Sequence, residues 1–443
     1  MQIDRRGLLA GAAGLAGVAA LSGCAPRAPR TEIGDWPTEV GDEPVTIDWW
    51  SANIATNEGG DLRPRLIEEF TKQYPNVRIN LVAAPADTDT NRTTLTTQIA
   101  AGSQSPDVIH GDIAWPGQFA ENSLATPLGT LVPDDFWDQY PEGLRSAASV
   151  DGEYYMFPVY IDNSFLVYRQ DLLDKHGLQV PGSWEEVVET SKALIDTGDV
   201  DYGFVFQGNV YEGMTCNAVE FVADAGGRFT DEDVTESTAT SSEARRGLEF
   251  MASLVSEGVT PRASLTYIEQ ASLDAFTTGR AAFLRNWSYA YDTANSPEAS
   301  SVAGKIGIRS RPGFDGTDET HTTIGGWGSY INPHTAKPAA ALAWARWLAD
   351  EDAQQLIVRE GGVIPARTAS LTSPDAKAAA KPQYEIAADY TLVPRPTATA
   401  FYPKVSQGIY VNANSIAAGQ SAVETGTSRM QRQMDVALAG QAL

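Results

Sequence analysis

The chain has 443 residues, of which 57 are acidic and 32 basic, for a formal net charge of −25 at pH 7. This length suggests two or three globular units, and 42% hydrophobic residues exclude a mainly disordered protein. The acidic balance argues against nucleic acid as a partner, because proteins that bind it usually present a basic face. Two cysteines and four histidines cannot build a thiolate zinc cluster or a disulfide scaffold.

The first residues are typical of an export signal, which we place at 1–23. The pair Arg5-Arg6 precedes a run of small and apolar residues that ends at Leu21 and is too short to span a bilayer, which takes about 20 residues. The sequence Leu21-Ser22-Gly23-Cys24 resembles the lipobox of bacterial lipoproteins. That resemblance implies cleavage before Cys24 and diacylglycerol on its sulfur. The alternative is an uncleaved, buried helix with a structural cysteine.

Residues 24–43 are rich in proline, arginine and threonine and predict a tether between the lipid and the fold. If Cys24 carries lipid, Cys216 is the only other thiol, and no internal disulfide can form.

Strand-like and helix-like stretches then alternate. Runs of β-branched and aromatic residues predict strands at 45–50, 77–82 and 106–110. Helical periodicity appears between them, at 62–74 and 91–101. This alternation predicts an α/β domain with a largely parallel sheet.

The second half of the chain is richer in helix. Helices are expected at 184–197, 211–225, 241–257, 267–278, 337–359, 405–418 and 422–438. Short strands are expected between them, at 202–206, 281–284, 305–308 and 328–331. Two lobes are predicted, with a ligand in the crevice where strand ends meet.

Motifs of catalysis are missing from the sequence. It has no G-x-S-x-G elbow, no phosphate-binding loop and no H-E-x-x-H, and the histidines show no metal-ligand spacing. We therefore expect neither an enzyme nor a bound metal or cofactor. The alternative that stays open is an exported glycosidase, in which Asp112 and Asp162 would form the carboxylate pair.

Several loop-like segments place an aromatic residue beside an acid, an asparagine or an arginine. This combination suits a neutral sugar, since its apolar C–H faces lie against flat rings while its hydroxyls bond to carboxylates and guanidinium groups. Each residue also has a structural interpretation. Trp115 is better explained as core, and Asp112 could instead stabilise a helix N-terminus, whereas the polar and glycine neighbours of Trp287 and Trp327 favour ligand contacts.

Taken together and in order, these segments resemble extracellular solute-binding proteins of ABC sugar importers, closest to the trehalose/maltose-binding group. The resemblance runs from about residue 45 to the C-terminus. The segments that carry it are Asp112–Phe119, Pro158–Asp162, Gln207–Gly213, Arg285–Ala290, Gly325–Trp327 and Val393–Pro396.

The resemblance implies an α/β, two-lobe periplasmic-binding-protein fold, similar to maltose-binding protein, with a ligand cleft at the hinge. Lobe 1 would comprise 44–158 plus 309–363, and lobe 2 would comprise 159–308 plus 364–443. The chain departs from the family at 163–165 and near 361–367, which would border the pocket and bear on the choice of sugar.

The resemblance also implies a site. Hydrogen bonds to sugar hydroxyls would come from Glu58, Arg92, Asp112 and Asp162. Ring contacts would come from Tyr160, Trp287, Tyr289 and Trp327, a backbone contact from Gly326, and a clamp from Arg395.

The expected function is therefore that of a receptor, anchored by lipid to the outer face of the cell membrane. It would capture an α-linked glucose disaccharide such as trehalose or maltose and deliver it to the membrane permease, as a monomer. The alternatives are another carbohydrate in the same fold, such as sucrose, a longer α-glucan or a sugar alcohol, or a purely structural envelope protein.

Overall fold

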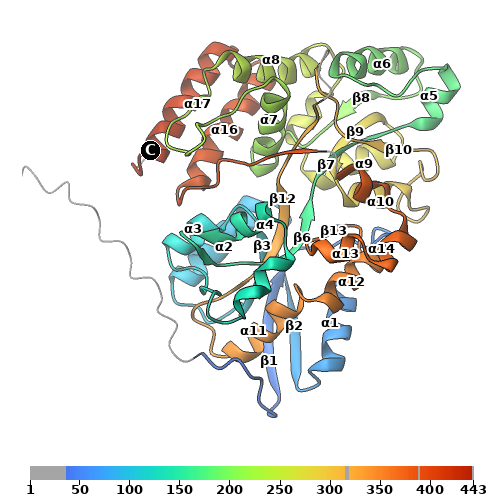
Figure 1. Ribbon diagram of the computed structural model, residues 1–443. Helices are drawn as coiled ribbons and strands as arrows, with labels where there is room; N and C mark the ends of the chain where they lie inside the picture. The colour runs from blue at the N-terminus through green and yellow to red at the C-terminus, as the bar shows by residue number, and fades with distance from the viewer. Residues whose placement is uncertain (1–35, 315–318, 388–389, 442–443) are drawn as a thin grey trace, which may run out of the picture.

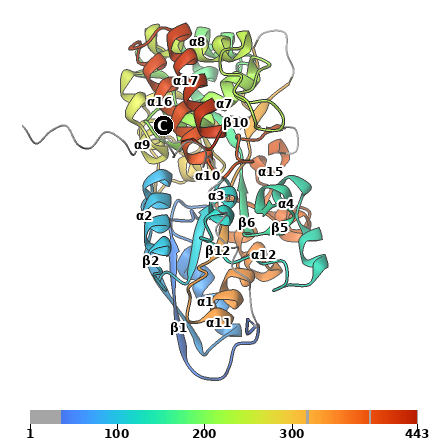
Figure 2. The same cartoon turned by 90° about the vertical axis from the view of Figure 1, so that its left-hand side faces the viewer.

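The computed structural model describes residues 36–314, 319–387 and 390–441. The expected export signal at 1–23 and the expected lipidation site at Cys24 lie outside these residues. The described chain folds into two lobes, one above the other in Figure 1 and again in the view turned by 90° in Figure 2. This arrangement confirms the predicted two-lobe α/β architecture.

The lower lobe in Figure 1 is built on a six-stranded sheet in the order β13-β6-β12-β3-β1-β2. Its strands are β1 (Val45–Ser51), β2 (Val77–Ala83), β3 (Val108–Asp112), β6 (Phe157–Asp162), β12 (Gly325–Ile331) and β13 (Ile364–Pro365). The prediction of a largely parallel sheet is wrong. Strand β1 pairs in parallel with β2 and β3, but β12 is antiparallel to both β3 and β6. The reason is that β12 re-enters this sheet from the other lobe.

The upper lobe holds a four-stranded sheet in the order β10-β7-β9-β8. Its strands are β7 (Ser164–Tyr168), β8 (Tyr202–Val205), β9 (Ala281–Trp287) and β10 (Gly307–Arg309). Two small pairs complete the strands: β4 (Ser149–Val150) with β5 (Glu153–Tyr154), and β11 (His321–Thr323) with β14 (Thr391–Val393).

Helices surround the six-stranded sheet and border its β13 edge. They are α1 (Arg63–Gln73), α2 (Thr88–Ala100), α3 (Pro116–Glu121), α4 (Glu142–Ala148), α11 (Pro338–Trp347), α12 (Glu351–Glu360), α13 (Thr368–Leu371) and α14 (Pro374–Ala379). The short helix α15 (Pro382–Ile386) contacts β10 of the smaller sheet. A short 3-10 helix spans Asp134–Gln139. The single helix expected at 337–359 is two helices, because the chain turns before Asp350 and a second helix begins with an acidic first turn, which suits a helix N-terminus.

A second set of helices covers the four-stranded sheet. They are α5 (Gln170–His176), α6 (Trp184–Asp196), α7 (Glu212–Asp224), α8 (Ser242–Ser256), α9 (Glu269–Thr277), α10 (Tyr289–Asn295), α16 (Tyr402–Ala417) and α17 (Val423–Leu438), with a 3-10 helix at Arg262–Thr266. The helices expected at 184–197, 211–225, 241–257, 267–278 and 422–438 are confirmed to within two residues at each end.

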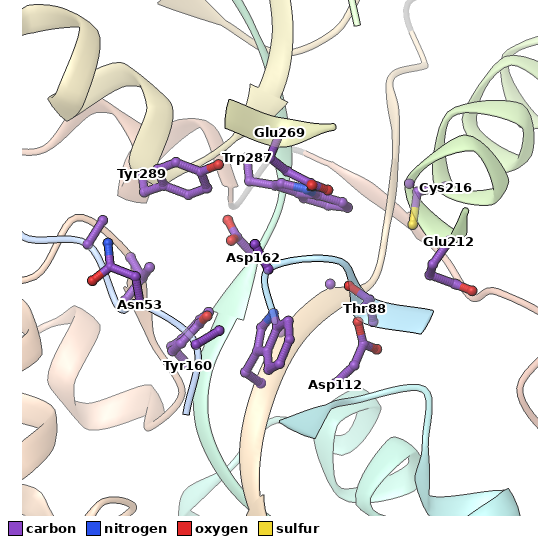
Figure 3. A pocket seen from close by; sticks show the side chains of 18 of the residues that line it. Asn53, Thr88, Asp112, Tyr160, Asp162, Glu212, Cys216, Glu269, Trp287 and Tyr289 are labelled. Atoms are coloured by element: carbon purple, nitrogen blue, oxygen red, sulfur yellow. Dashed lines mark hydrogen bonds between the residues drawn. The ribbon is translucent and has the colours of Figure 1, made fainter. Parts of the chain in front are cut away.

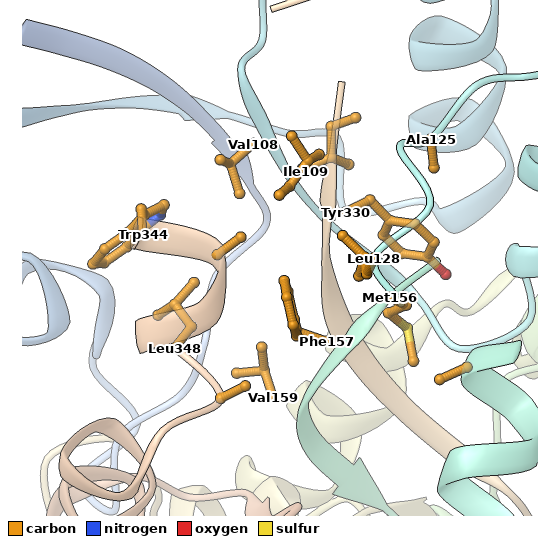
Figure 4. Packing of buried hydrophobic residues seen from close by; sticks show 14 of the residues in the cluster. Val108, Ile109, Ala125, Leu128, Met156, Phe157, Val159, Tyr330, Trp344 and Leu348 are labelled. Carbon is orange, nitrogen blue, oxygen red and sulfur yellow. The ribbon is translucent and has the colours of Figure 1, made fainter. Parts of the chain in front are cut away.

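Each lobe has its own hydrophobic core. In the lower lobe Trp49 meets Trp344 edge to face, with ring centroids 4.9 Å apart. Figure 4 shows Phe157, Val159 and Leu348 packed in the same cluster. Such close-packed interiors move as units, so they hold the ends of β3, β6 and β12 in a fixed relation.

Two of the places where the chain passes from one lobe to the other are neighbours, and a further passage lies between α14 and α16. Asn163 separates β6 of the larger sheet from β7 of the smaller, and Ile324 separates β11 from β12. The crossings at Asn163 and Ile324 both lie where the two lobes meet. The lobe boundaries at 158/159, 308/309 and 363/364 stay a prediction.

Candidate functional site

The register of the larger sheet places three of the predicted site residues in a row. Trp327 of β12 lies opposite Asp112, the last residue of β3, and opposite Tyr160 of β6 on its other side. Directly paired residues project from the same face of a sheet. Tyr160, Trp327 and Asp112 therefore form one continuous surface at the end of the lower lobe.

The residue before this tryptophan has to be glycine. Gly326 has φ of +146°, and a Cβ there would lie 2.6 Å from the carbonyl oxygen of Tyr160. Its own carbonyl accepts a hydrogen bond of 3.0 Å from the amide of Ile113. Gly326 thus lets the backbone of β12 approach β6 closely beside the site.

The upper lobe supplies two aromatic residues and an acid. Trp287 is the last residue of β9, Tyr289 begins α10, and Glu269 begins α9. The indole Nε1 of Trp287 donates to Glu269 Oε1 at 3.4 Å. Figure 3 shows these three side chains together above Asp162.

Asp162 ends β6 and connects the lower lobe to this group. Its Oδ1 accepts hydrogen bonds from both the amide, at 2.8 Å, and the hydroxyl of Ser288, which precedes Tyr289. Burial raises the pKa of Asp162 to about 7, against the opposing effect of those hydrogen bonds. Asp162 is thus a buried hydrogen-bonding group placed at the junction of the lobes.

Arg395 connects the lobes on the other side of the site. It follows β14, is 4% exposed, and donates from Nη2 to Asp112 Oδ1 and from Nη1 to Glu212 Oε1, both at 2.8 Å. Asp112 ends β3 in the lower lobe, whereas Glu212 begins α7 in the upper lobe. The guanidinium therefore bridges two carboxylates, one from each lobe.

Glu212 is held by further contacts. Its carboxylate accepts from the hydroxyl of Tyr402 and, at 2.6 Å, from that of Ser406, while its amide donates to Asp89 Oδ2 of α2 at 2.9 Å. Burial raises its pKa although Arg395 acts in the opposite direction. The contact with Asp89 is a second link between the lobes.

These groups enclose a cavity of about 210 Å³ between the lobes. Its lining includes all of the predicted site residues except two: Asp112, Tyr160, Asp162, Trp287, Tyr289, Gly326, Trp327 and Arg395.

Glu58 and Arg92 are not among the lining residues. Glu58 is exposed on the loop between β1 and α1. Arg92 pairs with Asp89 at 3.0 Å and donates to Gln118 at 3.1 Å. The roles in sugar binding that the resemblance implied for both residues stay predictions.

The lining also contains polar residues that the sequence did not single out: Asn53, Thr88, His110, Glu212, Cys216 and Glu269. Figure 3 shows Glu212 and Cys216 on α7, facing Asp112. Glu212 could have been found, because it lies in one of the segments that carry the family resemblance and begins a helix. Glu269 begins α9 far along the chain, and no local signal marks it as a neighbour of Trp287.

His110 lies beneath Trp327, with ring centroids 5.2 Å apart and planes 17° from parallel. Burial lowers the pKa of His110 to about 3, so the ring is neutral. A neutral, stacked imidazole gives Trp327 a flat support. By contrast, Trp115 is 2% exposed and packs on Phe119, as expected for a core residue.

The described residues include no group of three or more histidine, cysteine or acidic side chains placed to hold a metal ion. Among the helices within the described ranges, none combines the length and apolar character needed to cross a membrane. The chemistry of the cavity is that of aromatic faces and hydrogen-bonding carboxylates.

The fold and this interlobe cavity define a binding protein of two lobes. Residues 55–355 match the family of bacterial extracellular solute-binding proteins, and the chain belongs to that family.

Individual proteins of known sequence or structure are also similar to this chain. A probable ABC transporter-binding protein of Deinococcus radiodurans is 29% identical over 68% of this chain and 71% of its own. Maltose-bound MalE3 of T. maritima is 30% identical, with a TM-score of 0.81 over 88% of this chain and 99% of its own. An ABC transporter solute-binding protein of Thermotoga lettingae bound with alpha-D-tagatose is 22% identical, with a TM-score of 0.78 over 89% and 99% of the two chains. The last similarity concerns the fold alone.

Proposed function

We propose that the chain is the substrate-binding component of an ABC importer and captures an α-linked glucose disaccharide, such as maltose or trehalose, in the interlobe cavity. The observation that carries this proposal is the convergence of four aromatic residues and two strand-end carboxylates on that cavity. These residues are Tyr160, Trp287, Tyr289 and Trp327 with Asp112 and Asp162. The maltose-bound relative of T. maritima adds support.

The aromatic rings would bury the apolar faces of the sugar at little cost in rotamer entropy. Asp112 and Asp162 would accept hydrogen bonds from hydroxyl groups, and Arg395 would orient the Asp112 carboxylate and donate to the sugar from the cavity edge. Gly326 would offer backbone groups. Glu58 and Arg92 would act at the rim, Arg92 through Asp89 and the amide of Glu212.

Binding would favour the closed form, because the sugar touches groups of both lobes and only differential affinity shifts such an equilibrium. The loaded protein would then deliver its sugar to the membrane permease, without a catalytic step. We further propose that Cys24 carries lipid, that residues 24–43 tether the fold to the outer face of the membrane, and that the protein acts as a monomer.

A thermal-shift screen followed by calorimetry tests the proposal. A ligand that binds only the folded state raises the melting temperature, because at a concentration a hundredfold above Kd it adds about 2.7 kcal/mol to the free energy of unfolding. We expect maltose or trehalose to give the largest shift in a panel that includes sucrose, maltotriose, sugar alcohols and amino acids. A shift with a peptide or amino acid alone would reject sugar binding, and a larger shift with sucrose or mannitol would reassign the carbohydrate.

A further inference from the structure

A buried carboxylate outside the cavity collects hydrogen bonds from three separate elements. Glu220, on α7, is 0% exposed and does not line the cavity. Its Oε1 accepts from Ser164 Oγ at 2.7 Å, from Thr323 Oγ at 2.9 Å and from Arg285 Nη2 at 2.7 Å. Its Oε2 accepts from Arg285 Nε at 2.9 Å.

Two of these donors belong to the segments that join the lobes. Ser164 is the first residue of β7, directly after the crossing at Asn163. Thr323 is the last residue of β11, directly before the crossing at Ile324, and its amide also donates to Glu220, at 3.1 Å. One carboxylate therefore holds both of these segments to α7.

The third donor supports an aromatic wall of the cavity. Arg285 lies two residues before Trp287 on β9, and its guanidinium carbon is 4.1 Å from the centre of the indole ring. Gln207 fixes the same guanidinium, with Arg285 Nη1 donating to Gln207 Oε1 at 2.8 Å. A guanidinium over an indole face is an attractive contact that sets the position of the ring.

The charge on Glu220 is secured by its partners. Burial alone would raise its pKa, but Arg285 and Arg311 outweigh that effect and hold it at about 2. Arg311 in turn donates to Asp224 Oδ2 at 2.9 Å. Removing one partner from a buried network of ion pairs is strongly destabilising. The positions of Glu220 and Arg285 are therefore well defined.

We propose that Glu220 is a positioning residue for ligand capture, which joins the Arg285 support of Trp287 to two of the segments that connect the lobes. This inference rests on the proposed function, because it concerns the same cavity. Movement of Trp287 when a ligand packs on it is transmitted through Arg285 and Glu220 to Ser164 and Thr323, so occupancy of the cavity and closure of the lobes are coupled.

The test combines Glu220→Gln with Trp287→Phe in a double-mutant cycle on affinity for the best ligand of the panel. Asp107→Asn is the matched control, since Asp107 is equally buried and paired with Lys337 at 3.0 Å, but does not line the cavity or contact Trp287. We expect Glu220→Gln to weaken binding about tenfold, and to weaken it by less than about twofold when Trp287 is already Phe. Asp107→Asn should lower stability and leave affinity unchanged.

Equal losses from Glu220→Gln in the two backgrounds, or an equal loss in the Asp107 control, would overturn the inference. If Glu220→Gln does not fold, Ser164→Ala removes one donor without changing charge. It should then weaken binding and reduce the ligand-induced decrease in radius of gyration, and no change in either would overturn the inference.

If wild-type protein binds no member of the panel, the proposed function fails, but the position of Trp287 can still be measured. The near-ultraviolet circular dichroism of unliganded Glu220→Gln should differ from that of wild type, and the difference should disappear in the Trp287→Phe background. Identical spectra would contradict the positioning role.

Discussion

Asp112 and Trp327 lie directly opposite each other across β3 and β12. The antiparallel pairing puts a carboxylate and an indole from segments more than two hundred residues apart on one face of the sheet. Neither residue needs a loop to hold it, because both belong to the ladder of the larger sheet. The cavity floor is therefore as rigid as the lower lobe itself.

The first prediction concerns Trp327. Replacing it with alanine should weaken sugar binding by about 1–3 kcal/mol, because the stacking surface is lost. Isothermal titration calorimetry measures the change. Trp137→Ala is the control: Trp137 is a core tryptophan that does not line the cavity, so its loss should lower stability and leave affinity intact. Unchanged affinity in Trp327→Ala would show that the sugar lies elsewhere.

Arg395 should matter for stability as well as for binding. Arg395→Met leaves Asp112 and Glu212 without their shared cation, and breaking such a buried pair costs about 3–5 kcal/mol. Urea unfolding measures the loss. Arg280→Met is the control, because its ion pair with Asp201 is exposed and should contribute at most about 1 kcal/mol. Equal losses in the two variants would contradict the account.

Asp162 gives a pH signature. Its folded pKa of about 7 lies above the usual value of 3.8, so the folded state binds the proton more tightly than the unfolded state. Its stabilising contribution is present below pH 4 and is lost as the pH rises to 7. The unfolding free energy of the wild-type protein should therefore fall between pH 4 and 7, with a contribution from Asp162 of up to about 1.4 kcal/mol per pH unit. Asp162→Asn should remove that contribution. The measurement is urea unfolding of both proteins at several pH values. If plots of unfolding free energy against pH are parallel for wild type and Asp162→Asn between pH 4 and 7, the raised pKa is rejected.

Gly326 should not tolerate a side chain. Gly326→Ala combines a strained φ of +146° with a contact of 2.6 Å to the Tyr160 carbonyl oxygen. We expect a loss of about 1–3 kcal/mol in stability together with weaker sugar binding. Gly143→Ala, in α4 with no neighbour within 4 Å, should be neutral or stabilising. Thermal unfolding of both variants checks this, and a neutral Gly326→Ala would contradict it.

Much of this arrangement could be predicted from the sequence, and the exceptions have physical causes. The strand at 45–50 and the helix at 62–74 follow local patterns of apolar residues, and β1 and α1 confirm them. The antiparallel insertion of β12 could not be seen locally, because it depends on the chain returning from the other lobe. The same division holds for the site: residues with a local sequence signal were predicted, and residues that only the tertiary structure brings to the cavity were missed.

Asp112, Trp287 and Trp327 lie in segments whose local composition already differs from that of core strands. Glu269 was missed because only tertiary structure brings the start of α9 to Trp287. His110 was missed because nothing in its own strand distinguishes an imidazole that supports Trp327 from one in the core.

The central claim is that an α-linked disaccharide occupies the cavity between the lobes. Calorimetric titration of the wild-type chain with maltose and with trehalose tests it most directly. We predict saturable binding of one molecule of at least one of these sugars per chain, lost or strongly weakened in Trp327→Ala. Absence of binding heat with either sugar and with the other carbohydrates of the panel, in protein that remains folded, would contradict it.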